Sequence, residues 1–192
     1  MIEAKCYNQT IYVGGIEDGK CKKLSPNQDM ILVQELYSNK HEEADDRIMM
    51  HISHAGHIGI KSVLVFSADT DVFVGLSYHY LSSFNIEELH VIIGGSKHMQ
   101  TTVPIHLLVR QLNPVLISCL PAIHALTGCN TTSKVGTKAA IMKKSVDLEL
   151  IRSFGKTDLS ISVLENAEQF LLQMIGKGDF RTFDRLRYQL IL

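Results

Sequence analysis

One apolar run that ends in two acids constrains the fold of this chain more than any other segment. Residues 63–66 read Val-Leu-Val-Phe, and Asp69 and Asp71 follow them closely. A continuous, β-branched run of this kind predicts a buried strand of a parallel sheet. Carboxylates at the end of a buried strand are costly unless a positive charge, such as a divalent metal ion, neutralises them. The simpler interpretation is that Asp69 caps the helix that follows.

Patterning on both sides of this run predicts alternating strands and helices. Residues 30–36 fit a strand or a short helix equally well, and Pro121 is expected to kink an apolar helix that Pro114 opens. The other expected elements are a hairpin of residues 10–14 and 20–24 around Asp18-Gly19, a helix from the Asn39 and Glu42 capping box to about Ala55, a helix over 71–83, a second buried strand over 89–93, a short helix from Pro104 to about Leu112, and helices over about 134–143, 147–154 and 160–175. The predicted fold is α/β, a mainly parallel sheet covered by helices.

Composition favours one globular domain over residues 1–192, with a hairpin extension over 1–29 and a helical part over 134–192. Hydrophobic residues make up 45% of the 192 residues and the net charge is −1. A charge this close to zero argues against bulk electrostatic attraction to nucleic acid. We expect an intracellular protein, in the nucleus or cytoplasm, with no membrane partner, because we find no signal-like segment and no apolar run of roughly 18 residues.

A second acidic pair, Glu43 and Asp45, precedes an expected apolar helix stripe that begins at Ile48 and Met49. Asp45 therefore belongs at the N-terminal end of the buried face of that helix. Ligands in parallel sheets bind beyond the carboxyl ends of the strands, where Asp69 and Asp71 are expected. If the four acids meet there, their hard oxygen atoms suit Mg²⁺ or Mn²⁺. His124 falls in an apolar helix, where a hydrogen-bonded core histidine is the expected role.

Three ordered motifs, covering roughly residues 30–140, resemble the flap-endonuclease-like (PIN-like) nuclease superfamily. They look closest to the domain of transposon-derived and uncharacterised animal proteins. The motifs are His-Glu-Glu-Ala-Asp at 41–45, Asp-Thr-Asp-Val at 69–72 and His-Ala-Leu-Thr-Gly-Cys-Asn-Thr-Thr-Ser at 124–133. The resemblance implies a Rossmann-like sheet with acids gathered at one edge.

By this resemblance Glu43, Asp45, Asp69 and Asp71 are the catalytic and metal-binding acids. Asn130 stands where the family carries a further metal-binding Asp. The implied activity is hydrolysis of phosphodiester bonds in DNA, or less readily RNA, with two Mg²⁺ or Mn²⁺ ions. The segment 133–139 resembles a shortened form of the turn that grips the DNA backbone, and the lysines that could contact phosphate are Lys134, Lys138, Lys143 and Lys144. A solvated helix face is the simpler interpretation of these lysines.

Two other functions stay open at this point. Asn130 adds no negative charge, and no acidic strand end precedes the Glu43 motif as the family would require. These two departures from the family pattern leave two alternatives: the chain is the second half of a longer domain, or it is an inactive nuclease-like module that binds nucleic acid or protein. Asp-Thr-Asp-Val after an apolar strand also resembles the nucleophile motif of haloacid-dehalogenase-like phosphatases, although that motif normally opens the domain.

Asn130→Asp tests the missing charge. The substitution is nearly isosteric, so the variant should fold normally, bind Mn²⁺ more tightly and cleave single-stranded or flap DNA faster. Calorimetric titration with Mn²⁺ and a nuclease assay on both proteins measure this. Unchanged Mn²⁺ affinity would place the turn after Gly128 outside the metal site.

Overall fold

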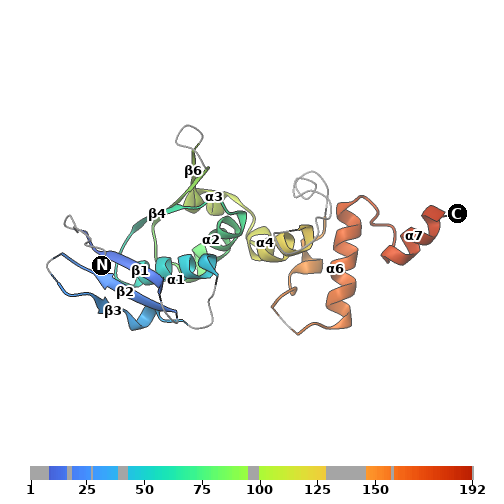
Figure 1. The fold of residues 1–192 in the computed structure, drawn as a ribbon. Helices are drawn as coiled ribbons and strands as arrows, with labels where there is room; N and C mark the ends of the chain where they lie inside the picture. Colours follow the sequence, from blue (N-terminus) through green and yellow to red (C-terminus); the bar gives the residue numbers. More distant parts are fainter. Residues whose placement is uncertain are drawn as a thin grey trace. The chain divides into compact units, whose positions relative to one another are not determined.

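The computed structural model describes residues 9–16, 19–26, 28–38, 43–94, 100–128, 146–156 and 158–191. Within these residues the chain is α/β, with two three-stranded sheets and six α-helices. Its contacts divide it into two compact units, Met1–Ala68 with His79–Pro104, and Asp69–Tyr78 with Ile105–Leu192. Figure 1 shows the elements of each unit.

The first sheet of the first unit is antiparallel and has the order β1-β2-β3. Strands β1 (Ile11–Ile16) and β2 (Lys20–Leu24) form the expected hairpin, and β2 pairs with β3 (Ile31–Leu32). A 3-10 helix, η1 (Gln34–Leu36), follows, so the ambiguous segment contains both a short strand and a short helix. Helix α1 (Ala44–His57) lies beside this sheet, as Figure 1 shows, and Met50 packs on a small core of Cys21, Val33 and Leu36.

The second sheet has the order β4-β5-β6. Strands β4 (Ser62–Phe66) and β5 (Glu88–Ile93) are parallel, while β6 (Thr101–Pro104) is antiparallel to β5. One parallel pair does not confirm the expected mainly parallel, PIN-like sheet. The two predicted strands are in place, but β6 was not expected from the sequence.

Strand β4 is not the buried strand that its apolar sequence predicted. It lies at one end of the sheet among the described strands, and Leu64 and Phe66 are 50% and 67% exposed. Leu89 and Val91 of β5 are fully buried, and in the parallel register they pair with Val63 and Val65. Leu64 and Phe66 pair with His90 and Ile92 instead, so they lie on the opposite face of the sheet. An uninterrupted apolar run therefore indicated a strand correctly, but not that one face of that strand is exposed.

A glycine allows a close approach at the end of α1. A Cβ atom added at Gly56 would lie 3.0 Å from the backbone nitrogen of Asn85, which follows α2 (Thr70–Ser83). Tyr80 of α2 donates a hydrogen bond from its hydroxyl to the carbonyl of Glu87, over 2.8 Å. The close approach at Gly56 brings the turn between α2 and β5 to the C-terminal end of α1, and the Tyr80 bond ties α2 to the residues just before β5.

The second unit contains the first part of α2, up to Tyr78, and the helices that follow β6. It contains α3 (Ile105–Gln111), α4 (Pro114–Thr127), the 3-10 helix η2 (Leu148–Ile151), α6 (Ile161–Met174) and α7 (Phe183–Ile191). Pro104 belongs to β6, so the predicted short helix begins one residue later. A 3-10 helix occupies part of 147–154, and α7 is a helix that follows the last one expected from the sequence. The predicted helix over 134–143 lies outside the described residues.

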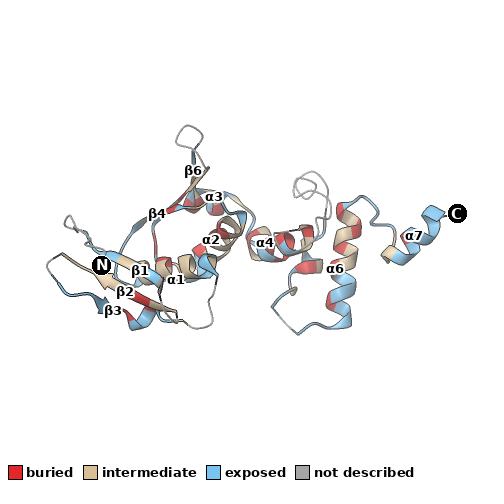
Figure 2. Ribbon diagram, viewed as in Figure 1, coloured by how far each residue is buried: buried red, intermediate tan, exposed pale blue. Residues whose placement is uncertain are grey.

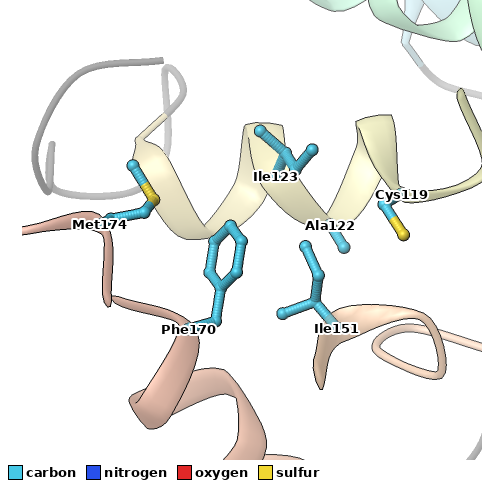
Figure 3. Close-up of a cluster of buried hydrophobic side chains, with 6 residues drawn as sticks. All are labelled: Cys119, Ala122, Ile123, Ile151, Phe170 and Met174. Carbon is cyan, nitrogen blue, oxygen red and sulfur yellow. The ribbon is translucent and has the colours of Figure 1, made fainter. Parts of the chain in front are cut away.

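The core of this unit forms where α4, η2 and α6 meet. Phe170 and Met174 point from α6 toward Ala122 and Ile123 of α4, and Ile151 of η2 packs beside them, as Figure 3 shows. The side chain of Asn113 accepts a hydrogen bond from the amide of Val115, which caps α4 before Pro114. Buried positions run along much of α4 (Figure 2), as expected for a helix that is apolar almost all round.

His51 of α1 gives the first unit a dependence on pH. Burial, together with the positive charges of His54 and Arg47, lowers the pKa of His51 from its ordinary value of 6.5. The unfolded chain therefore takes up this proton at a higher pH than the folded chain does. The stabilising contribution is fully present above the unfolded pKa and is lost as the pH falls through that value toward the folded pKa.

His51→Gln should reduce this dependence, because glutamine keeps a polar side chain that does not titrate. Melting midpoints between about pH 7.5 and about pH 5.5 measure the effect, and the variant should lose less stability on acidification than the parent. His57→Gln, at an exposed position of the same helix, is the control. Equal losses in both variants would contradict the assignment to His51.

Candidate metal centre

Asp69 and Asp71 lie at the start of α2, directly after the strand that their motif follows. Asp69 precedes the first helical residue, Thr70, and its Oδ1 accepts a hydrogen bond from the amide of Asp71 over 2.9 Å. This is the geometry of a helix N-cap, so the simpler interpretation of Asp69 is confirmed. An N-cap carboxylate has two oxygen atoms and further lone pairs, so capping leaves it able to bind a cation.

Asp71 is held by a histidine from a distant part of the sequence. Nε2 of His124, on α4, lies 2.5 Å from Oδ1 of Asp71. His124 is buried and Asp71 is partly exposed, so the carboxylate lies at the boundary between the apolar helix and solvent. The predicted role of His124 as a hydrogen-bonded core residue is confirmed, and the structure adds the identity of its partner.

Three carboxylates could hold a metal ion. One oxygen atom from each of Asp45, Asp69 and Asp71 lies within 4.8 Å of the others. Two ligands of one Mg²⁺ ion, at ~2.1 Å each, lie between ~3 Å and ~4.2 Å apart in octahedral geometry, so the carboxylates would have to move together to share one ion. The donors are all hard carboxylate oxygens, which fit Mg²⁺ or Mn²⁺ better than a softer metal.

Glu43 is not part of this three-carboxylate group. It is exposed at the N-cap position of α1, and its side chain makes no capping hydrogen bond there. The first turn of α1 instead carries Asp45, which is half-buried. The two residues are separated by one position, so they leave the helix start in different directions, and only Asp45 joins Asp69 and Asp71.

The remaining predicted site residues lie outside the described residues. These are the proposed fifth ligand and the four candidate phosphate contacts, Asn130, Lys134, Lys138, Lys143 and Lys144. Their roles stay predictions from the sequence.

Comparisons with known proteins add no relative. No protein-family model, no curated protein and no solved structure matches this chain. Within the described residues, no single helix is long and apolar enough to cross a membrane; α3 and α4 meet the length and composition test only as a pair bent by 113°. The argument about function therefore rests on the chemistry of the site and on the motifs of the sequence.

Two substitutions separate the capping role of Asp69 from its charge. Asp69→Asn keeps the oxygen that accepts from Asp71 N–H, whereas Asp69→Ala removes it. Without added metal, urea unfolding should show a loss of about 0.5–2 kcal/mol for the alanine variant and a much smaller change for the asparagine variant. Equal losses would mean that the carboxylate charge, rather than the cap, stabilises the helix.

Proposed function

We propose that this chain is a metal-dependent, nuclease-like domain that hydrolyses phosphodiester bonds in nucleic acid. The observation that carries the proposal is the approach of three aspartate oxygens within 4.8 Å. Like charges this close repel one another, and a bound dication converts that repulsion into attraction. The resemblance of the three sequence motifs to the PIN-like superfamily supports the same chemistry, with DNA favoured over RNA and with action inside the cell.

Asp45, Asp69 and Asp71 would hold Mg²⁺ or Mn²⁺. When bound, such an ion lowers the pKa of a coordinated water and neutralises charge on phosphate oxygens. The protein would fix the direction of two of these carboxylates: Asp69 through the amide of Asp71, and Asp71 through His124. Three carboxylates provide charge for one dication and part of a second, so the second ion of the expected two-ion site should bind weakly.

An inactive nuclease-like module is the second candidate. It is favoured by the exposed position of Glu43, which leaves three rather than four acids in the group, and by the neutral residue at 130. Such a module would keep the fold and bind nucleic acid or another protein without cleaving it. The structure gives no support to the phosphatase alternative. Asp69, which would be the nucleophile, caps helix α2, and β4 before it lies at the end of its sheet among the described strands.

Metal binding gives the direct test. Because an ion that binds the folded chain stabilises it by mass action, Mn²⁺ at 100 times its Kd should add about 2.7 kcal/mol. For a chain of this size the melting midpoint should rise by roughly 2–4 °C per kcal/mol. Asp69→Asn combined with Asp71→Asn should abolish the rise and the cleavage of single-stranded or flap DNA.

The control neutralises two acids elsewhere in the chain. Glu149 and Asp184 form exposed ion pairs with Arg152 and Arg187, so Glu149→Gln with Asp184→Asn makes the same change in net charge. This variant should keep the full response to Mn²⁺. An unchanged midpoint for the parent protein would refute the metal site, whereas a rise without cleavage would select the inactive module.

A further inference from the structure

The contact between His124 and Asp71 is unusual for the helix that provides it. Helix α4 is apolar along most of its length, and the side chain of His124 is 11% exposed. Placing an imidazole in such surroundings costs free energy unless a partner satisfies it. Leucine would fill the same space without that cost. The histidine therefore needs an explanation beyond the packing of α4.

The contact is a hydrogen bond between a ring nitrogen and a carboxylate. Oδ1 of Asp71 lies 2.5 Å from Nε2 of His124. An ionised carboxylate can only accept, so Nε2–H is the donor. Hydrogen bonds with an ionised partner are shorter and roughly twice as strong as neutral ones, and burial of the imidazole strengthens this one further.

The bond fixes the direction of a carboxylate that still has capacity for a cation. A carboxylate accepts at two oxygen atoms with about four lone-pair positions. The His124 bond uses one of these positions. Asp71 is also tied at its backbone, where its amide donates to Asp69 Oδ1. Side-chain rotation, the remaining freedom of Asp71, is thus restrained by His124 before any ion binds.

We propose that His124 is a positioning residue for the metal centre, which acts by holding the Asp71 carboxylate in the orientation that ligates the ion. The inference rests on the proposed metal-dependent function. His124 would not touch the ion or the substrate. Partners that hold metal ligands in this way typically change metal affinity or activity by 10–100-fold when they are removed.

Substitutions at His124 test the proposal through Mn²⁺ affinity, measured by calorimetric titration without nucleic acid. His124→Leu removes the donor and should weaken binding by about 10–100-fold. His124→Gln places an amide nitrogen where Nε2 lies and should bind within a few-fold of the parent. The matched control is Thr127→Val, which removes a buried hydroxyl from the same helix, one that donates to the carbonyl of Ile123. It should leave Mn²⁺ affinity unchanged.

A double-mutant cycle separates positioning from general packing. If His124 acts through Asp71, then His124→Leu should weaken Mn²⁺ binding in the parent but change nothing further in an Asp71→Asn background. An equal loss in both backgrounds would overturn the proposal, as would parent-like affinity in His124→Leu. If the leucine variant does not fold, the glutamine variant decides: parent-like affinity supports positioning, and a loss as large as that of Asp71→Asn overturns it.

The outcome is distinguishable from failure of the proposed function. A parent protein that binds no Mn²⁺ refutes the metal site itself. A parent that binds Mn²⁺, with a His124→Leu variant that binds it equally well, refutes only the role assigned to His124. Melting midpoints without metal accompany each titration, and the leucine variant should be at least as stable as the parent because an apolar side chain suits that position.

Discussion

The hydrogen bond between His124 and Asp71 is the interaction on which the candidate site depends. It joins the first turn of α2 to helix α4, from which Cys119, Ala122 and Ile123 pack in an apolar core (Figure 3). Ala122 and Ile123, which immediately precede the histidine, contact Phe170 and Ile151 within that core. A rigid, close-packed helix is a precise support for a polar group, since its neighbours permit little displacement. The core of the second unit thereby sets the position of one acidic side chain at the surface.

Local sequence signals predicted most elements of the fold. The Asp-Gly turn indicated the first hairpin, and Pro114 marked the first residue of α4. Strand β6 was missed because its four residues are few and end in proline, which argues against a strand. Helix α7 was missed because its sequence is largely polar; its start is instead held by a bond from the amide of Phe183 to Glu168 on α6. Tertiary contacts of this kind leave no periodic pattern in the sequence.

The acids of the site were also predictable only in part, because local patterns mark single residues but not their partners in the folded chain. Asp69 and Asp71 follow an apolar strand, and Asp45 opens an apolar stripe, so short patterns identified all three. Glu43 shares the motif of Asp45, but it lies two positions earlier, at the N-cap, and so its side chain leaves the start of the helix in a different direction. The partner of Asp71 lies 53 residues away. A histidine in an apolar helix predicts a polar partner, but only the folded structure shows which residue that partner is.

The end position of β4 has a practical consequence. Among the described strands β4 pairs on one side only, and its residues Leu64 and Phe66 are exposed. Strand edges that combine unpaired amides with apolar side chains tend to recruit further strands from other molecules. Concentrated solutions of the isolated chain are thus prone to self-association along β4. A lysine in place of Phe66 would guard that edge, as charged residues do on the edge strands of many natural sheets.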